Sequence, residues 1–391
     1  MNEATRDFIR EHESDDVRQV ALRGCKNPAV DLPLALRQID GRQKAKYKLP
    51  ELYAHPEILY PAAISLEQCS SSETAQYKSA LLSGQDFADL TGGFGIDTFA
   101  FAPNFEQCHY VEPQHTLCQL AQHNATVLGI NNIHIHESTL EEALSELPTV
   151  DCLYLDPSRR DSRGNRVVIL EECTPDLTRW KDELLGKTRR SLLAKLSPML
   201  DIKRTLQQLP ETTAIHVVAV NNECKEVLFL LEPNANSHEV IVSAANIKNG
   251  GTDVFRFSTL EEQNAVPTLA DELGEYLFEP NAAIMKAGGF KTVATRFDIR
   301  KLHPHTHLYT CSQPIDHFPG RTFRIEQTIP FSKKAAKQLL VKQANIAARN
   351  FPLSAEELKK SLKIKDGGDT YIFGATLTGD KKVLLLCSKI Y

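Results

Sequence analysis

Hydrophobic residues between positions 81 and about 245 fall into short runs, separated by stretches in which apolar residues recur three and four positions apart. The runs predict buried β-strands and the intervening stretches predict amphipathic helices. Strands that alternate with helices favour a parallel, helix-covered sheet, an α/β fold. The expected strands are DFADLTG (86–92), QCHYVEP (107–113), NIHIHES (132–138), DCLYLDP (151–157), SLLAKLSP (191–198), AIHVVAVN (214–221) and HEVIVSAANIK (238–248), with KEVLFLLEP (225–233) as a strand or a helix.

The flanking regions have other patterns. Residues 1–80 show helical spacing interrupted by prolines, and the last part of the chain predicts the order βαβαββ. There, Ser354 followed by Glu357 predicts a capping box, and Gly379-Asp380 predicts a two-residue hairpin turn of type II′. We therefore expect an N-terminal helical region (1–80), an α/β core (81–250), a small segment (276–318) and a C-terminal α+β domain (319–391).

Composition excludes several classes of protein. Of 391 residues, 42% are hydrophobic and 24% charged, and no apolar run approaches the ~18 residues of a membrane span. The acidic start MNEATRDFIREHE lacks the apolar core of a secretion signal. Nine scattered cysteines without a C-x-x-C pair argue against disulfides and a zinc site. We expect a cytoplasmic protein with reduced thiols and no metal.

A histidine-rich stretch, HPHTH, would place His303, His305 and His307 on one face if it formed a strand. No cysteine or carboxylate lies within the stretch, so an exposed polar strand is favoured over a metal site.

Charge is distributed unevenly along the chain. Residues 280–391 contain 19 Lys and Arg against 8 Asp and Glu, a local charge of +11, whereas the remainder carries −16. A basic C-terminal part suggests a polyanionic partner; the alternative is a basic domain that docks on an acidic one.

The stretch DLTGGFGID (89–97) contains three glycines between an expected strand and helix, where parallel sheets bind ligands at the carboxyl ends of their strands. A dinucleotide site requires G-x-G-x-x-G/A, but the pattern from Gly93 ends in Thr98. S-adenosylmethionine (SAM) has no pyrophosphate and needs an acid for its ammonium group, which Asp89 supplies. The sequence therefore favours SAM.

Polar residues also follow the next expected strands. Glu112 lies 19 residues after Gly93, where a carboxylate can accept hydrogen bonds from ribose hydroxyls. Glu137 or Ser138 ends the third strand, and Asp156 ends the fourth. Lys195, near the end of the fifth, is a phosphate contact or an ion-pair partner.

Residues 65 to about 240 resemble a class I SAM-dependent methyltransferase with a Rossmann-like core. DLTGGFGID is similar to its glycine-rich motif, YVEP (110–113) to its ribose-binding acid and LDPSRR (155–160) to its substrate-facing motif. EQCSSSETAQYKSALL (67–82) resembles the helix that closes over the cofactor, although Ser70 and Glu73 also fit a capping box. The resemblance implies a cofactor site formed by Ser70, Asp89, Thr91, Gly92, Gly93, Phe94, Gly95, Asp97, Glu112, Glu137 and Ser138. It implies a catalytic group formed by Asp156, Pro157, Ser158 and Arg159, in which Asp156 orients or deprotonates the acceptor.

The whole chain resembles a bacterial group in which this core precedes a ferredoxin-like segment (276–318) and a THUMP-like domain (319–391). THUMP domains are associated with RNA-modifying enzymes. The helix expected at SKKAAKQLLVK (332–342) has lysines in its first turn, where they oppose the helix dipole unless a phosphate binds there. The expected RNA-binding patch consists of Arg321, Arg324, Lys333, Lys334 and Lys337.

Several positions depart from the methyltransferase motifs. Ser138 stands where an aspartate commonly contacts the adenine, and no aromatic residue follows Asp156-Pro157. An arginine after Asp-Pro is similar to RNA 5-methyluridine enzymes, but Cys173 and Cys224 lack the context of their nucleophile. We expect a SAM-dependent methyltransferase of transfer or ribosomal RNA. The alternatives are an RNA-binding or assembly protein with a non-catalytic fold, and a methyltransferase of a protein or small molecule.

Overall fold

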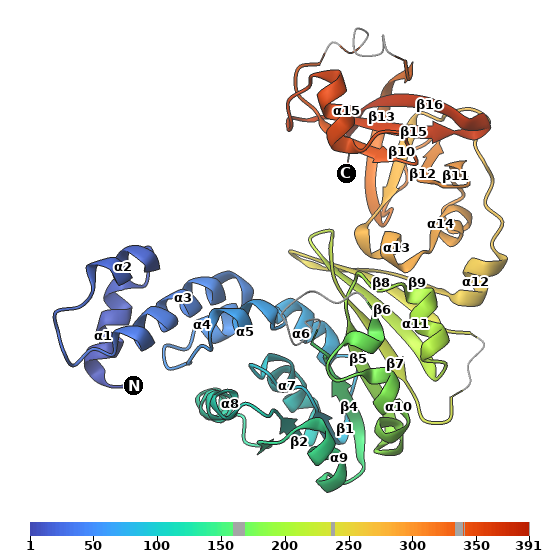
Figure 1. The fold of residues 1–391 in the computed structure, drawn as a ribbon. Helices are drawn as coiled ribbons and strands as arrows, with labels where there is room; N and C mark the ends of the chain where they lie inside the picture. The colour runs from blue at the N-terminus through green and yellow to red at the C-terminus, as the bar shows by residue number, and fades with distance from the viewer. Residues whose placement is uncertain (159–168, 236–238, 333–338, 340, 391) are drawn as a thin grey trace. The chain divides into compact units, whose positions relative to one another are not determined.

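The computed structural model describes residues 1–158, 169–235, 239–332, 339 and 341–390. The chain divides into two compact units (Figure 1). Unit 1 comprises Met1–Thr213 with Leu228–Asn236, and unit 2 comprises Ala214–Val227 with Ser237–Tyr391. The predicted active-site motifs all belong to unit 1.

Unit 1 begins with a run of helices. These are α1 (Glu3–His12), α2 (Val17–Arg23), α3 (Leu32–Lys48), α4 (Pro50–Tyr53), α5 (Ala63–Gln68) and α6 (Ser72–Ser79). The side chains of Asn2, Asp16 and Asp31 accept hydrogen bonds from the free N–H groups at the starts of α1, α2 and α3. Leu49, Tyr60 and other buried residues of this region form one hydrophobic core with Phe94 of the glycine-rich turn. Burial of that ring anchors the turn to the helices.

The α/β core contains a nine-stranded sheet with the order β3-β2-β1-β4-β5-β7-β6-β8-β9. The strands are β1 (Gly84–Asp89), β2 (Phe105–Val111), β3 (Ile133–His136), β4 (Val150–Leu155), β5 (Thr188–Leu196), β6 (Thr212–Val220), β7 (Glu223–Leu231), β8 (Ile241–Lys248) and β9 (Gly251–Ser258). The intervening helices are α7 (Ile96–Phe101), η1 (Ala102–Asn104), α8 (His115–Val127), α9 (Leu140–Glu146), η2 (Leu170–Glu172), α10 (Leu177–Gly186) and α11 (Ile202–Gln208). The expected α/β fold with parallel strands is confirmed, although β9 pairs antiparallel with β8, and KEVLFLLEP forms strand β7.

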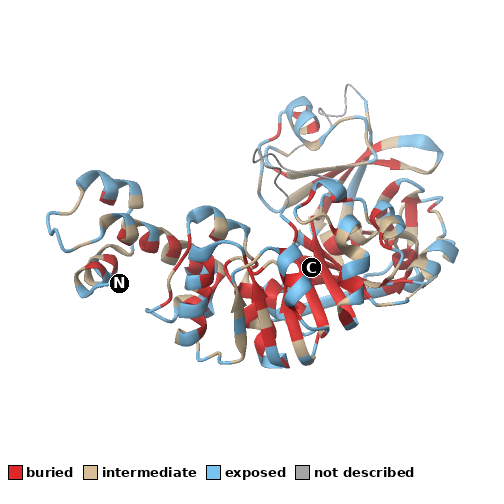
Figure 2. Cartoon of the chain, turned by 60° about the horizontal axis from the view of Figure 1, so that its bottom comes forward, coloured by how far each residue is buried: buried red, intermediate tan, exposed pale blue. Residues whose placement is uncertain are grey.

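Strand order and burial locate the crevice of the sheet. Strands β1 to β5 are parallel, and the order reverses between β1 and β4. Such a switch point opens a ligand-binding crevice at the carboxyl ends of the strands. Buried residues concentrate in the strands (Figure 2), including nearly all of β4 and the second half of β5. The sheet is therefore a rigid support for the polar residues that follow its strands.

Unit 2 contains a seven-stranded sheet with the order β11-β12-β10-β13-β16-β15-β14. Its strands are β10 (Tyr276–Pro280), β11 (Arg300–His303), β12 (Thr306–Cys311), β13 (Gly320–Pro330), β14 (Asn345–Arg349), β15 (Thr370–Leu377) and β16 (Lys381–Lys389). The helices are α12 (Thr259–Asn264), α13 (Ala282–Ala287), α14 (Phe290–Arg296), α15 (Ala355–Leu362) and η4 (Thr378–Asp380). Antiparallel pairing of β10 with β13 joins the small segment and the C-terminal domain in one sheet.

Three local predictions in unit 2 have clear outcomes. The capping box of Ser354 and Glu357 at α15 is confirmed. The two-residue type II′ turn is wrong: Leu377 pairs with Lys381, so three residues connect the strands, and Gly379 and Asp380 both have positive φ (75° and 59°). The single strand expected at HPHTH is also wrong, because the stretch forms the turn between β11 and β12.

Candidate active site

The glycine-rich turn leads from β1 to α7, and each of its three glycines is required for a different reason. A Cβ on Gly92 would lie 2.2 Å from the Tyr110 ring, so packing inside the protein excludes a side chain there. Gly95 has φ +88°, and a Cβ would lie 2.8 Å from Phe99. Gly93 has φ +54°, and among the described residues the only atom within 4 Å of its Cβ position is the Thr91 carbonyl oxygen, at 3.7 Å. Of the three glycines, Gly93 therefore has room beside it for a ligand.

Glu112 follows β2 and is held against the same turn. Its Oε2 accepts a hydrogen bond from the Gly93 N–H (3.0 Å), and its Oε1 accepts one from the Gln114 N–H (2.9 Å). A carboxylate has about four acceptor sites, so both oxygens retain capacity for further donors. The 19-residue spacing noted in the sequence thus corresponds to a direct contact.

Asp89 ends β1 and is almost completely buried, at 1% exposure. Its carboxylate accepts hydrogen bonds from the Thr91 N–H (2.9 Å), the Thr91 hydroxyl (3.3 Å) and the Thr98 hydroxyl (2.6 Å). Burial raises the pKa of Asp89 to about 7, although the hydrogen bonds from Thr98 and Thr91 oppose the shift. The Asp89 carboxylate therefore holds the turn through these hydrogen bonds, and little of its surface remains for a ligand.

Asp156 follows β4, beside Asp89 on the adjacent strand. The Asp156 N–H donates to the Thr91 hydroxyl (2.7 Å), and its carboxylate forms a 2.6 Å ion pair with the Lys195 ammonium of β5. The carboxylate is 30% exposed, whereas the Lys195 side chain is 7% exposed. The structure therefore presents an accessible carboxylate at the switch point, supported by a buried cation.

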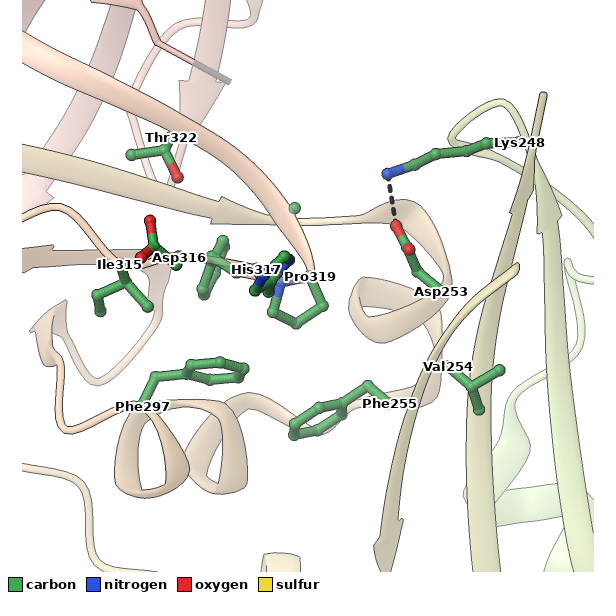
Figure 3. Close-up of a pocket in the computed structure, with 12 residues that line it drawn as sticks. Lys248, Asp253, Val254, Phe255, Phe297, Ile315, Asp316, His317, Pro319 and Thr322 are labelled. Carbon is green, nitrogen blue, oxygen red and sulfur yellow. Dashed lines mark hydrogen bonds and ion pairs between the residues drawn. The ribbon is translucent and has the colours of Figure 1, made fainter. Parts of the chain in front are cut away.

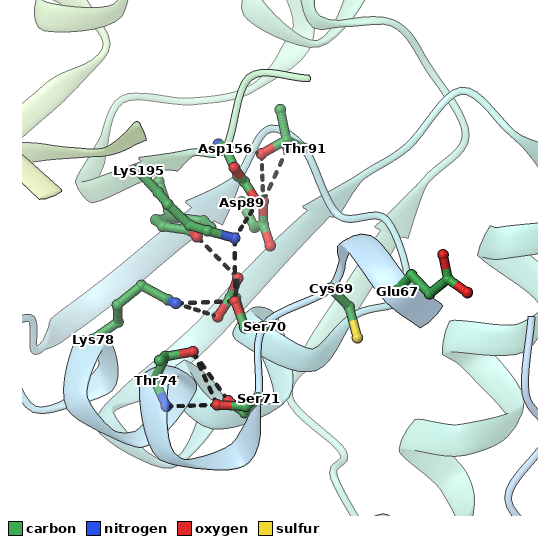
Figure 4. A network of polar contacts seen from close by, with 12 residues as sticks. Glu67, Cys69, Ser70, Ser71, Thr74, Lys78, Asp89, Thr91, Asp156 and Lys195 are labelled. Atoms are coloured by element: carbon green, nitrogen blue, oxygen red, sulfur yellow. Dashed lines mark hydrogen bonds and ion pairs between the residues drawn. The ribbon is translucent and has the colours of Figure 1, made fainter. Parts of the chain in front are cut away.

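A buried polar cluster lies behind this pair (Figure 4). The Ser70 hydroxyl donates to Asp97 Oδ2 (2.8 Å) and accepts from Lys78 (3.0 Å) and Lys195 (3.3 Å). The capping box predicted for Ser70 and Glu73 is wrong, because the N-cap of α6 is Ser71, whose side chain accepts from the Thr74 N–H. Ser70 belongs to the cluster instead.

Asp97, in the first turn of α7, holds the other end of the cluster. It accepts from the Tyr154 hydroxyl (2.9 Å) and forms an ion pair with Lys78 (3.2 Å), which is fully buried. Burial alone raises the pKa of Asp97, but the charges of Lys78 and Lys195 and the hydrogen bonds from Ser70 and Tyr154 outweigh it, so the pKa is lowered. Lys78 and Tyr154 had no role in the sequence analysis. The one sequence signal for a nearby cation was Asp97, the acid that follows the glycines.

The remaining predicted site residues are dispersed. Glu137 is exposed and bonds His115 (2.6 Å), and Ser138 is half-buried at the end of β3. Pro157 is buried, and Ser158 is exposed and pairs through its backbone with Thr174. Arg159 lies outside the described residues.

The thiols offer no activated nucleophile in the expected positions. All nine cysteines are free. Cys173 is buried with its Sγ 3.6 Å from the Ile169 carbonyl oxygen, and burial raises the pKa of Cys224 to about 11. A thiol with a raised pKa is a poor nucleophile, because the thiolate is the reactive form.

The five residues predicted to bind RNA belong to unit 2, and two of them, Arg321 and Arg324, are among the described residues. Arg321 donates to Glu279, which also accepts from Arg349, and Arg324 pairs with Glu275 at 2.8 Å. Lys333, Lys334 and Lys337 lie outside the described residues. The described arginines are therefore already paired with carboxylates, while the RNA-binding patch stays a prediction.

A cavity of about 570 Å³ also lies in unit 2 (Figure 3). The Phe255 and Phe297 rings line one side of it, and Asp316 and His317 line another. At its edge Lys248 pairs with Asp253 at 2.5 Å. Acidic and basic groups are mixed in the lining, so its charge selects no class of ligand.

Comparisons with known proteins agree with this architecture. The chain matches a family described as a ferredoxin-like domain over residues 276–319 and one described as THUMP domain-like over residues 320–389. A crystal structure of a candidate methyltransferase from Porphyromonas gingivalis W83 is 36% identical, covers 99% of this chain and 98% of its own, and has a TM-score of 0.88. A search of curated proteins gives no match.

Two other solved structures have weak similarity. They are an rRNA methylase from Streptococcus thermophilus (12% identity, 41% of this chain, 94% of that chain, TM-score 0.31) and a candidate methyltransferase from Streptococcus mutans in complex with SAH (11% identity, 41%, 96%, TM-score 0.31). At these values we draw nothing from them.

The strand order and the glycine-rich turn define a Rossmann-like methyltransferase core. With the full-length match, they show that the chain belongs to the family of class I SAM-dependent methyltransferases that carry a ferredoxin-like segment and a THUMP-like domain. Within the described part of the chain, no helix is long and apolar enough to cross a membrane.

Proposed function

We propose that this methyltransferase acts on RNA, with transfer or ribosomal RNA as the substrate class. The observation that carries the proposal is the accessible Asp156 carboxylate at the switch point, beside the glycine-rich turn, in a chain that ends in a THUMP-like domain. A basic C-terminal part provides the electrostatic attraction that a polyanion requires.

The residues around the glycine-rich turn fit SAM. Open space beside Gly93 admits a ligand close to the backbone, and the spare acceptor sites of Glu112 suit the two hydroxyls of a ribose. Asp89 holds the turn through Thr91 and Thr98 and leaves little surface for direct contact with the ammonium group. When bound, SAM supplies a methyl group on a positively charged sulfur. Glu112 would therefore hold the ribose and the turn would hold the methionine end.

Asp156 is the residue that we assign to the acceptor. A methyl acceptor must be held in line with the methyl group, and an acceptor that carries a proton must lose it. The Asp156 carboxylate has exposed surface for that contact, and its backbone and its ion pair with Lys195 fix its position. Asp156→Ala should lower methyl transfer by about 10²–10⁴-fold and leave SAM affinity nearly unchanged.

Mass analysis of RNA from a strain that lacks the protein tests the substrate class. We expect one methylated nucleotide to disappear, and the gene for the parent, but not for Asp156→Ala, to restore it. Full restoration by Asp156→Ala would leave RNA binding or assembly as the function. An unchanged set of modified nucleotides would direct the search to proteins and small molecules.

A further inference from the structure

The hydroxyl of Ser70 uses its full hydrogen-bonding capacity inside the protein. A serine hydroxyl has one donor and two acceptor sites. Ser70 donates to Asp97 and accepts from the ammonium groups of Lys78 and Lys195, and its residue is only 5% exposed. Nothing remains with which this hydroxyl could bind a cofactor.

The three partners belong to separate parts of unit 1. Lys78 comes from α6, Asp97 from the helix that follows the glycine-rich turn, and Lys195 from β5. Lys195 in turn reaches Asp156, so a continuous path of hydrogen bonds leads from Ser70 to the exposed carboxylate (Figure 4). The residues of this path are brought together by the tertiary fold and lie up to 125 positions apart.

We propose that Ser70 is a positioning residue: it fixes the ammonium of Lys195, and Lys195 fixes the Asp156 carboxylate toward the methyl acceptor. The inference rests on the proposed function only in the role given to Asp156. A single ammonium on a flexible stem holds a carboxylate loosely, because its three donors rotate freely. The contact with Ser70 adds a fixed partner for the Lys195 ammonium besides Asp156 and so restricts its position.

Adjacent serines provide a matched pair of variants. Ser70→Ala removes the hydroxyl from the cluster, and Ser70→Thr retains a hydroxyl. Ser71→Ala makes the same change one residue along the chain, where it removes the cap of α6 and leaves the cluster intact. Loss of helix stability is thereby separated from loss of positioning.

The experiment uses the full chain, labelled SAM and total RNA from a strain that lacks the protein. We expect Ser70→Ala to lower kcat by about 10- to 100-fold, since small misplacements of a reacting group have effects of that size. SAM affinity, measured by calorimetry, should change less than about threefold. A change that small is clearly separated from the expected effect on kcat. Ser70→Thr should recover most of the rate, and Ser71→Ala should lower Tm without a comparable effect on kcat.

Two results would overturn the inference. If Ser70→Ala weakens SAM binding and keeps kcat, Ser70 is a cofactor ligand, as the sequence suggested. If Ser70→Ala and Ser71→Ala lower Tm alike and spare kcat, Ser70 is structural only.

Crystal structures of Ser70→Ala and Ser70→Thr test the positioning without a substrate. We expect the Lys195 ammonium to leave hydrogen-bonding distance of Asp156 in the alanine variant and to remain there in the threonine variant. An unchanged pair in the alanine variant contradicts the inference. A parent enzyme that transfers no methyl group to this RNA contradicts the proposed substrate and leaves the structural result to decide the role of Ser70.

Discussion

Unit 1 and unit 2 both contain groups of paired charges, but the pairs differ in exposure. In unit 1, the side chains of Lys78 and Lys195 are 0% and 7% exposed; both donate to the Ser70 hydroxyl, and they pair with Asp97 and Asp156 respectively. In unit 2, the side chains of Arg321 and Arg349 are 35% and 37% exposed, although the Glu279 that joins them is 4% exposed. The comparison separates ion pairs enclosed by the protein from ion pairs whose cations stay in contact with solvent.

The physical difference is the cost of losing a partner. A buried ion that loses its partner keeps its desolvation penalty, whereas an exposed ion regains water. Single changes in the unit 1 cluster should therefore have large effects, and similar changes among the exposed arginines small ones.

The largest effect is expected from Lys78→Met, which removes the fully buried cation paired with Asp97 and leaves Lys195 as the remaining cation nearby. We expect a loss of about 3–5 kcal/mol in the free energy of unfolding. Trp180, the only tryptophan of the chain, lies on α10 in unit 1, so its fluorescence in urea reports this unit. Arg324→Met, at 56% exposure in unit 2, is the control; followed by far-UV circular dichroism, which also reports unit 2, it should cost at most about 1 kcal/mol. Equal losses in the two variants would remove the distinction between the units.

The second-largest effect concerns the pH dependence of stability and comes from Asp89. This residue is buried, and its carboxylate is held by hydrogen bonds from Thr91 and Thr98. Its folded pKa of about 7 lies above the unfolded value of about 3.9, so between these values the native state holds a proton that the unfolded state has lost. Its contribution to stability is therefore lost as the pH rises from about 4 to 7, by up to about 4 kcal/mol. Asp89→Asn cannot ionise and should flatten this decline. Urea midpoints by Trp180 fluorescence at pH 5 and 7.5 measure it, and equal slopes in parent and variant would contradict the assignment.

Glu112→Ala should have a smaller effect, and on the cofactor. Removal of the charge-assisted hydrogen bonds to the ribose should weaken SAM binding by about 1.5–3 kcal/mol. Calorimetry on parent, Glu112→Ala and Glu137→Ala provides the measurement and its control, since Glu137 is exposed and bonded to His115. If only the Glu137 variant loses affinity for SAM, the ribose is bound at the end of β3 and not by Glu112.

The smallest effect concerns RNA, where the charges are exposed and screened by salt. The triple change Lys333→Glu, Lys334→Glu, Lys337→Glu should weaken RNA binding about tenfold at physiological salt, or about 1.4 kcal/mol. It should also reduce the slope of log affinity against log salt by up to about 3, roughly one unit for each phosphate that a lysine no longer neutralises. The control is Arg296→Gln, a basic residue outside the predicted patch that is paired with Glu261. If the triple variant and the parent have the same affinity and slope, another surface binds the RNA.

Much of the fold was present in the sequence pattern. The apolar runs marked the strands of the α/β core because burial on both faces of a sheet requires continuous apolar residues. The sequence also placed Asp89, Glu112 and Asp156 at strand ends, which a parallel sheet gathers along one edge. The turn at Gly379-Asp380 and the stretch from His303 to His307 were misassigned because the apolar pattern did not fix where the strands of each hairpin begin to pair, at Leu377 with Lys381 and at His303 with Thr306.

The sequence by itself determined the class of the protein, through a local motif whose glycines and acids lie within nine consecutive residues. It could not separate the glycines that serve internal packing, Gly92 and Gly95, from Gly93, because the Tyr110 ring that excludes a side chain at Gly92 lies on another strand. Nor could it show that Ser70 joins Lys78, Asp97 and Lys195 instead of capping a helix. Only the tertiary structure decided these roles, because the free energy of a buried charge depends on which groups surround it, and those groups come from four separate segments of the chain.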